Sequence, residues 1–204
     1  MRKTARFLVE KGFTLVELLI VIALIGVLAV AVLAAINPLE QLNRARDTGM
    51  ESDASQLLAA IDRYYASQEE FPWVTVYKAG GTGGVANNDA AYGFTSAQVQ
   101  AVGVCGADCT ADGVLLMNLE LKSEFRKRKF ITTTDTTGTE LLYIGKAQGA
   151  STSVYSCWVP KSRSNRAKAT QTLTVGSTAM GTAADCVTRT YASLDTSCVI
   201  CIPR

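Results

Sequence analysis

One long uncharged stretch restricts the folds that this chain can adopt. The 19 positions from Leu18 to Ile36 carry no charged or strongly polar side chain. At about 1.5 Å of rise per residue, a helix of that length spans nearly the ~30 Å hydrocarbon core of a bilayer. The stretch therefore predicts a membrane-spanning helix.

The charges on either side of the stretch predict its orientation. The residues that follow it carry mixed charge, whereas those before it are mostly basic. The charged residues ahead of the stretch are Arg2, Lys3, Arg6, Glu10 and Lys11. Because basic flanks stay in the cytoplasm, we expect the N-terminus on the inner side of the cytoplasmic membrane and the long C-terminal part on its outer side. Two simpler interpretations also fit the stretch: a secretory signal peptide cleaved after Ala31, or an uncleaved anchor.

An acid lies within the apolar sequence that begins at Phe13. Placing the Glu17 carboxylate in hydrocarbon costs roughly 2.5 to 3.5 kcal/mol on insertion scales, so an acid at such a place usually has a function. The string Lys11-Gly12-Phe13-Thr14-Leu15-Val16-Glu17 is followed at once by the apolar run. It resembles the cleavage and methylation motif of type IV pilins and of the related pseudopilins of type II secretion.

The resemblance implies a processing step and an assembly mode. A prepilin peptidase and methyltransferase would cut after Gly12 on the cytoplasmic face and leave Phe13 as an N-methylated N-terminus. Glu17 would neutralise the terminal amine of a neighbouring subunit and so set register, since any other offset buries both charges alone. Such a contact does not close on itself, so its repetition yields a filament. The implied partners are copies of the chain, other pilins, the membrane before assembly and an inner-membrane assembly platform.

The chain accordingly divides into three predicted parts. They are a leader peptide at residues 1–12, a transmembrane or filament-core helix at 13–36, and an extracytoplasmic globular pilin-like domain at 37–204. Four cations against one acid give the leader a charge of +3, which leaves −1 of the total +2 on the mature chain. After assembly the mature chain would lie in a cell-surface pilus or in a periplasmic pseudopilus.

A proline follows the apolar run directly. The helix is expected either to kink at Pro38 or to restart there with Asn37 as its cap. In the resembling family a helix-weakening proline usually falls a few residues earlier, where this chain has Ala34. Apolar residues then recur at three- and four-residue spacings, which predicts helix from about Phe13 to Ser67 with one face of its second half on a core. The residues of that face are Leu39, Leu42, Ala45, Met50, Ala54, Leu57, Leu58, Ile61, Tyr64 and Tyr65.

Loops and then antiparallel strands are predicted beyond the helix. Residues 79–113 are rich in glycine and asparagine, as in a surface loop. The order of helix, loop and strands favours an α+β fold, in which the long N-terminal helix packs against a small antiparallel sheet. The expected elements are short helices at Ser96–Val102 and Val114–Phe125, strands at Lys129–Thr134, Glu140–Gly145 and Ser153–Val159, and a surface loop or edge strand at Thr170–Met180.

All six cysteines follow the apolar run, in the part predicted to lie outside, which fits disulfides formed in an oxidising compartment. We expect a local bridge between Cys105 and Cys109, and we expect the three C-terminal cysteines to pin the end of the chain, with Cys157 as a partner in the strands. Those three are Cys186, Cys198 and Cys201. Two alternatives stay open: a zinc site with four cysteine ligands, and a redox pair of Cys198 with Cys201.

Composition argues against an enzyme. The chain has no histidine, which excludes Ser-His-Asp and Cys-His catalysis and histidine-ligated zinc. No two acids have a spacing typical of general acid and base work. We therefore expect no catalytic residues, no metal and no cofactor.

One basic run, from Arg126 to Lys129, would suit DNA or an acidic surface, although such a run is more often a solvated helix end. We interpret the chain as the prepilin of a type IV pilus or pilus-like filament. The alternatives are a pseudopilin of type II secretion and, from another class, a membrane-anchored or secreted binding protein or enzyme.

Overall fold

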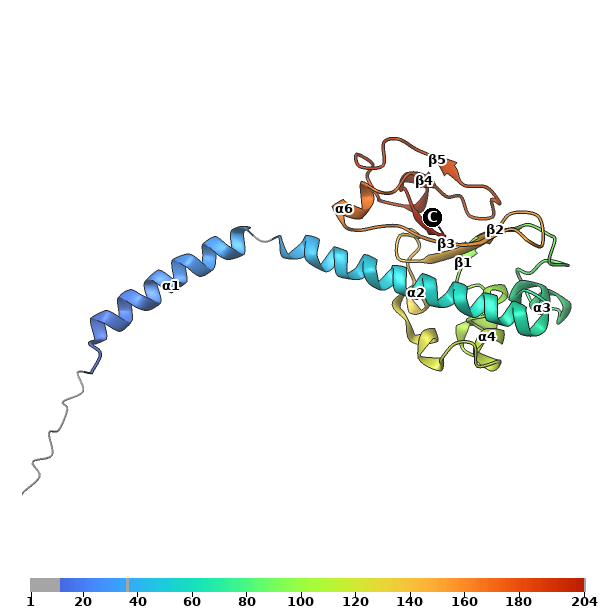
Figure 1. Ribbon diagram of the computed structural model, residues 1–204, viewed down its shortest axis with the longest axis horizontal. Coiled ribbons are helices and arrows are strands. Elements are labelled where there is room, and N and C mark those ends of the chain that lie inside the picture. Colours follow the sequence, from blue (N-terminus) through green and yellow to red (C-terminus); the bar gives the residue numbers. More distant parts are fainter. Residues whose placement is uncertain (1–11, 36, 204) are drawn as a thin grey trace, which may run out of the picture. The chain divides into compact units, whose positions relative to one another are not determined.

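The computed structural model of the protein describes residues 12–35 and 37–203 (Figure 1). These residues form two compact units, with the boundary between Leu39 and Glu40. Helix α1 (Leu15–Ala35) makes up most of the first unit. Helix α2 (Pro38–Gln68) begins at the end of the first unit and lies mainly in the second, which contains the sheet and the core.

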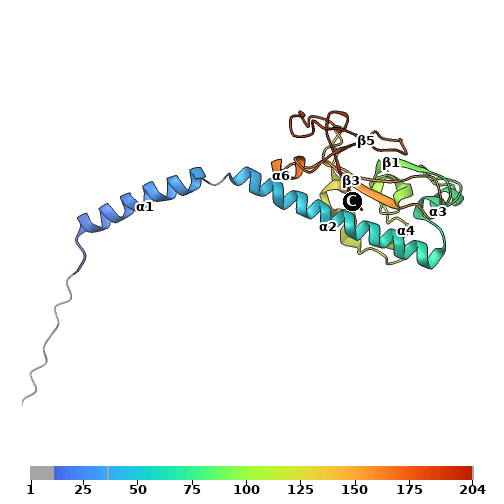
Figure 2. The same cartoon turned by 45° about the horizontal axis from the view of Figure 1, so that its top comes forward.

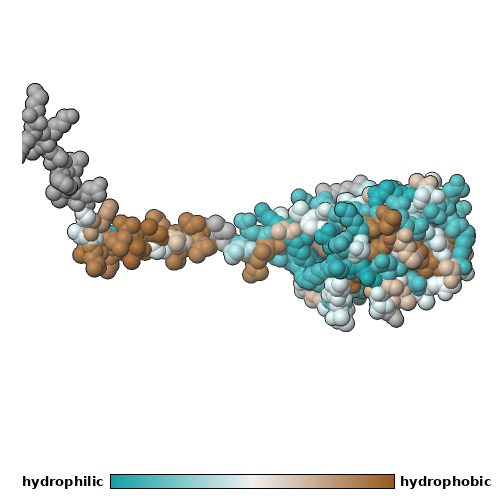
Figure 3. Space-filling view, turned by 90° about the horizontal axis from the view of Figure 1, so that it is seen from below, coloured by the Kyte–Doolittle hydropathy of each residue, from teal (hydrophilic) through white to brown (hydrophobic). Residues whose placement is uncertain are grey.

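Apart from Glu17 in its first turn, helix α1 is apolar on every side. None of the 19 residues from Leu15 to Leu33 is buried in the isolated chain, and within the described residues this is the one helix long and apolar enough to cross a membrane. Figure 3 shows hydrophobic side chains covering its surface. A helix that is hydrophobic all round is stable only when lipid or other protein covers it.

Helix α2 restarts the helical backbone at Pro38, where the fixed φ of proline and its missing N–H are tolerated. Its apolar buried residues recur at helical spacing, and they are Met50, Ala54, Leu57, Ala60, Ile61 and Tyr64. The predicted amphipathic helix is therefore confirmed. The expected face was too long at its start, because Leu39, Leu42 and Ala45 are exposed and the core begins only at Met50.

Four antiparallel strands form the main sheet, in the order β1-β2-β3-β6. Their bounds are Tyr92–Ser96 for β1, Leu142–Lys146 for β2, Val154–Trp158 for β3 and Ile200–Ile202 for β6. Strands β2 and β3 pair in unbroken register from Leu142 opposite Trp158 to Lys146 opposite Val154. All five residues of β2 are buried, so both faces of the sheet are covered.

Residues 171–182 of the C-terminal segment lie on the side of the sheet away from helix α2, as Figures 1 and 2 show, whereas residues 161–166 adjoin the start of α2. The segment contains α6 (Arg163–Arg166) and a two-stranded sheet of β4 (Gln171–Thr172) and β5 (Gly181–Thr182). It also reaches the two outer strands of the main sheet. The Gly176 N–H donates to the Phe94 carbonyl over 2.8 Å, and the Val199 N–H donates to the Gln171 carbonyl over 2.8 Å. These bonds occupy edge groups that would otherwise be open to another chain.

The predicted α+β class and the strands at Glu140–Gly145 and Ser153–Val159 are confirmed. Three local expectations are wrong. The strand expected at Lys129–Thr134 is a helical turn, α5 (Lys129–Thr132), whose Phe130 and Ile131 are buried. The helix expected at Val114–Phe125 stops after α4 (Val114–Met117), because the chain turns at Leu119 with a φ of 59°. The loop expected at 79–113 contains strand β1.

The remaining elements are short. The helix expected at Ser96–Val102 is reduced to a 3-10 turn, η1, because Ser96 ends strand β1. The segment Thr170–Met180, expected as a loop or an edge strand, contributes β4. The other bounds are Pro72–Lys78 for α3, Gln100–Val102 for η1, Ala107–Cys109 for η2, Ser123–Lys127 for η3 and Leu194–Thr196 for η4.

Two glycines allow a matched test of packing in the second unit. A Cβ on Gly145, in β2, would lie 2.6 Å from the Phe94 ring, whereas a Cβ on Gly49, in α2, would meet nothing within 4 Å. We predict that Gly145→Ala destabilises the fold by about 1–3 kcal/mol through overpacking. Gly49→Ala should stabilise it by up to about 1 kcal/mol, because alanine favours helix.

The measurement is the urea midpoint of the full chain in detergent, followed by the fluorescence of Trp73 and Trp158, both of which are buried. Equal midpoints for the two variants would contradict the packing seen at Phe94.

Candidate functional site

The backbone around Gly12 and Phe13 is open. Helix α1 begins at Leu15, so the Gly12–Phe13 peptide bond lies ahead of the helix in non-helical backbone. A Cβ on Gly12 would meet nothing within 4 Å, and Phe13 is 87% exposed. A peptidase could therefore reach this bond without unwinding α1. Lys11 and the rest of the predicted leader, residues 1–11, lie outside the described residues, as does Ile36.

The start of α1 is a reciprocal cap between Thr14 and Glu17. The Glu17 N–H donates to the Thr14 hydroxyl over 3.2 Å, and the Thr14 N–H donates to the Glu17 carboxylate over 2.9 Å. The Thr14 hydroxyl also donates to that carboxylate over 2.8 Å. This is a capping box, which satisfies backbone donors that a helix start leaves open. The Glu17 carboxylate thus has a partner within its own chain.

Thr14 is the residue of this site that the sequence analysis missed. Its signal was present, because Thr14 and Glu17 have the Thr-x-x-Glu spacing of a capping box. Glu17 was interpreted only as a partner for another subunit, so its local role went unnoticed.

The structure places the six cysteines in three disulfides. They join Cys105 to Cys109, Cys157 to Cys201, and Cys186 to Cys198. The second bridge links β3 to β6, and the third closes a loop in the C-terminal segment. Cys198 and Cys201 are thus bonded to different partners rather than to each other, unlike the redox alternative. In the described part of the chain, no group of three His, Cys, Asp or Glu side chains is placed to hold a metal ion.

A buried carboxylate joins α2 to the loop before α6. Asp47 is fully buried and accepts from the Lys161 N–H over 2.9 Å, the Ser162 N–H over 2.8 Å and the Ser162 hydroxyl over 2.7 Å. The Asn165 amide donates to it as well, over 3.1 Å. With this many donors, a buried carboxylate holds two segments that are more than a hundred residues apart in sequence.

Glu40, in the first turn of α2, makes a second link between α2 and α6. Its carboxylate accepts from the Arg163 N–H over 3.0 Å, and Arg44 lies 3.3 Å from it. The Arg163 N–H, with smaller help from Arg44, lowers the pKa of Glu40 below its ordinary value. Glu40 therefore favours its charged form in the folded domain.

Three of the four cations in the run from Arg126 to Lys129 contact groups of their own domain. Arg126 donates to the Thr110 carbonyl over 2.8 Å, Arg128 lies 3.6 Å from Asp53, and Lys129 lies 3.1 Å from Glu140. Desolvation raises the pKa of Asp53, and the Arg128 charge opposes that shift. Three of the four cations are thus engaged within the domain, so fewer of them are left to bind DNA.

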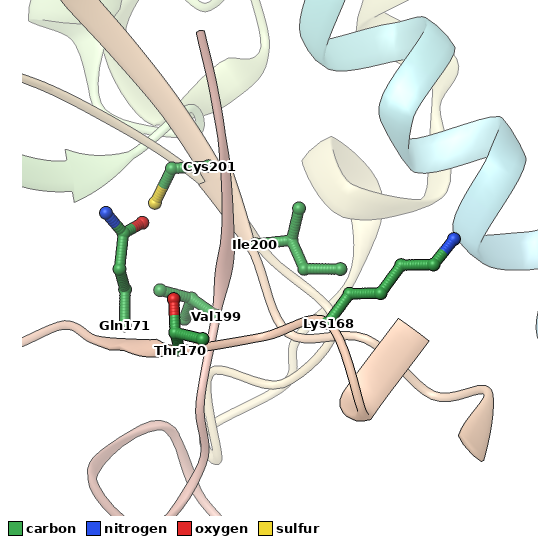
Figure 4. Close-up of a pocket in the computed structure, with 6 residues that line it drawn as sticks. All are labelled: Lys168, Thr170, Gln171, Val199, Ile200 and Cys201. Atoms are coloured by element: carbon green, nitrogen blue, oxygen red, sulfur yellow. The ribbon is translucent and has the colours of Figure 1, made fainter. Parts of the chain in front are cut away.

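A small hollow lies beside β6, with a volume of about 200 Å³. Figure 4 shows the residues that line it, and the Lys168 side chain extends away from Gln171 and Cys201. The six lining residues are Lys168, Thr170, Gln171, Val199, Ile200 and Cys201. They include no acid, so the hollow holds no pair of groups suited to general acid and base chemistry.

The class of protein follows from these features. An apolar helix, exposed on every side and capped by an acid, stands ahead of a disulfide-bonded α+β domain. Residues 9–33 match the family model described as the prokaryotic N-terminal methylation motif, which is the signal motif of type IV pilins and pseudopilins. The resemblance noted for residues 11–36 is thereby confirmed, over about an eighth of the chain. Comparison with curated proteins and with solved structures found no match.

The disulfides should differ in their contribution to stability. The Cys157–Cys201 bridge closes a loop 44 residues long, whereas Cys105 and Cys109 are separated by four. In the loop-entropy model, replacing both cysteines of Cys157–Cys201 with alanine costs about 4 kcal/mol, and replacing both cysteines of Cys105–Cys109 costs about 2 kcal/mol. Thermal unfolding of the two double variants under non-reducing conditions measures the difference. Equal losses would mean that packing around the bridges, rather than loop closure, dominates.

The pKa of Glu40 predicts a pH dependence. Because its folded pKa lies below the unfolded value, its stabilisation is complete above about pH 4.5 and is lost as pH falls through the folded pKa. Glu40→Gln should therefore lower the urea midpoint at pH 7 and have a much smaller effect near pH 3. A difference between wild type and variant that does not change with pH would contradict this prediction. Asp62→Asn, which changes an exposed acid about six turns further along α2, serves as the control.

Proposed function

We propose that the chain is a prepilin, the structural subunit of a type IV pilus or pilus-like surface filament, processed after Gly12 and assembled through α1. One observation carries the proposal: the methylation motif at residues 9–33 coincides with a helix whose whole apolar surface is exposed. In this assignment residues 1–12 are the leader, 13–36 form the transmembrane and filament-core helix, and 37–204 form the displayed domain.

Cleavage after Gly12 would change the electrostatics at the start of α1. Before cleavage the chain has no charged amine at Phe13, and Glu17 is the charge nearest the start of α1, hydrogen-bonded by Thr14. Cleavage on the cytoplasmic face by the prepilin peptidase creates an amine four residues from Glu17. Within a bundle of copies, a neighbour displaced along the axis brings its amine to that carboxylate.

Register follows from the cost of an unpaired buried charge. When α1 helices pack together, water is excluded, and breaking a buried ion pair costs about 3–5 kcal/mol. Only the axial offset that pairs each amine with a neighbour's Glu17 avoids this cost. The contact is heterologous and does not close, so it extends into a filament. The partners of the assembled chain are accordingly its own copies and other pilins, built onto an inner-membrane platform.

The globular domain is suited to display outside the membrane. Its three disulfides are formed in an oxidising compartment, and its core lies between Met50 and Cys201. None of that core involves α1, so α1 keeps its whole surface for lipid or for other copies. Whether the domain is displayed on a surface pilus or on a periplasmic pseudopilus depends on the assembly proteins with which the chain interacts in the cell.

The N-terminal residue of the mature protein tests the processing step. Intact-mass and N-terminal sequencing of protein from its native membrane should give a chain that starts at Phe13 and carries one extra methyl group. A start at Val32 would instead identify a secretory signal peptide, and an intact Met1 would identify a simple anchor. Fibres sheared from cells should contain the protein if it is a pilin, whereas a pseudopilin of type II secretion would be missing from them.

Two variants at the start of α1 separate register from capping. Glu17→Val should insert normally and be processed but should lower filament yield more than about tenfold, because each amine would be left buried and unpaired. Thr14→Val removes the two hydrogen bonds of the Thr14 hydroxyl and keeps the backbone N–H bond to Glu17, a loss of about 1 kcal/mol, and should leave filaments at reduced yield. Quantitative immunoblots of sheared filaments and of membranes provide both readouts. Equal loss in the two variants would assign Glu17 a capping role alone.

A further inference from the structure

A group of cations lies where α6 and the residues around it pack beside the first turns of α2. We call it the α6 basic surface, and it consists of Arg44, Lys161, Arg163, Arg166 and Lys168. Arg44 and the backbone of Arg163 both contact the Glu40 carboxylate, so the two segments adjoin. Cations and acids are equal in number over residues 37–204, so this group is a local excess of positive charge.

Three of the acids near this surface are largely buried. Asp47 is fully buried beneath Ser162 and Asn165. Glu140 has a side chain only 14% exposed and contacts Arg46, Lys129 and Lys161. Glu40 accepts the hydrogen bonds of α6. The charges that remain at the surface are therefore mainly positive, and the Arg44 side chain is 62% exposed.

Among the described residues, neither guanidinium of α6 forms an ion pair with a carboxylate, although the backbone N–H of Arg163 donates to Glu40. The Arg166 guanidinium lies over the Tyr191 ring at 4.1 Å and donates to the Pro160 carbonyl, contacts that orient it but carry no opposite charge. Arg163 and Lys168 are exposed. In Figure 4 the Lys168 side chain extends away from Gln171 and Cys201.

Chain connectivity limits how far this surface can be from a bilayer. Glu40 follows Ala35, the last residue of α1, by five residues, and an extended chain reaches at most about 3.6 Å per residue. Glu40 is thus tethered within about 18 Å of the end of α1, and α6 is hydrogen-bonded to Glu40 itself. Basic side chains held this close to a membrane are attracted to anionic lipid, over a Debye length of about 8 Å at physiological ionic strength.

We propose that the α6 basic surface binds the anionic phospholipid head groups on the outer face of the membrane before assembly. The inference rests on the proposed membrane anchoring of α1. Bound to lipid, the surface would hold the domain against the bilayer, and extraction into a filament would release it. Salt would weaken the contact, since it consists of exposed charges.

Hydrogen exchange of the full chain in vesicles tests this proposal. The chain is reconstituted in phosphatidylcholine alone and in phosphatidylcholine with phosphatidylglycerol at about two to one, and exchange is followed by mass spectrometry. Amides of residues 161–168 should exchange several-fold more slowly in the anionic vesicles. Sodium chloride at about 0.5 M, where the Debye length falls to roughly 4 Å, should abolish the difference.

A matched pair of variants assigns the effect to this surface. Arg163→Gln with Lys168→Gln should remove the protection, whereas Lys122→Gln with Lys127→Gln, which removes the same charge from other exposed positions, should leave it intact. Protection that grows with the protein-to-lipid ratio in both kinds of vesicle would identify a second copy as the occupant and overturn the proposal. So would equal exchange in neutral and anionic vesicles, or equal effects of the two variants.

The amides of α1 report anchoring in the same samples. If they are protected while residues 161–168 show no dependence on lipid charge, the lipid contact alone is wrong. If they exchange freely, the anchoring in the proposed function fails, and the lipid contact fails with it.

Discussion

The exposed apolar surface of α1 is the constraint on which the rest of this molecule depends. The exposed apolar side chains of its nineteen residues from Leu15 to Leu33 are unfavourable in water, so covering them with lipid or with other helices stabilises the chain. A chain with this feature needs a second unit that folds without it. The core from Met50 to Cys201 meets that need, since it uses no residue of α1.

Helix α2 joins the exposed helix α1 to the unit that contains the core. Its first turns carry exposed Leu39 and Leu42, and burial begins at Asp47, where α2 first packs against the loop before α6. The packing of α2 at this point involves charged groups as well as apolar ones. Asp47 and Glu40 are hydrogen-bonded by backbone N–H groups of residues 161–164, which fixes the C-terminal segment on the helix. The same segment covers the sheet and reaches both of its outer strands, so much of the domain is held in place by residues close to its end.

Periodic features of the fold were predictable from sequence, and features set by single contacts were not. The apolar run and the amphipathic spacing of α2 repeat over many residues, so neighbouring positions support one another. Strands β2 and β3 followed instead from their apolar and aromatic residues on either side of a glycine-containing turn. Strand β1 is five residues long and contains Gly93, and its place in the sheet depends on pairing with β2, far along the chain. The helical turn at Lys129–Thr132 was mistaken for a strand because Phe130 and Ile131 are residues that favour strands, while the burial that selects the turn is tertiary.

The candidate site shows the same division. The cleavage position and Glu17 followed from a contiguous motif, whereas the cap on Glu17 depends on where two side chains point. The α6 basic surface joins residues more than a hundred positions apart, so no local pattern in the sequence marks it.

The cap also explains how a carboxylate can be accommodated in an apolar helix before assembly. In the free chain the Glu17 carboxylate accepts from the Thr14 N–H and hydroxyl, so under the proposed function it enters the membrane with hydrogen bonds already made. Such a cap is worth about 1 kcal/mol, which is less than the roughly 3–5 kcal/mol lost when a buried ion pair is broken. Under the proposed function, a neighbour's amine can therefore displace Thr14, but no such amine exists until the Gly12–Phe13 bond is cut. Cleavage then supplies the stronger partner, and the small energy of the cap makes the exchange favourable in the direction of assembly.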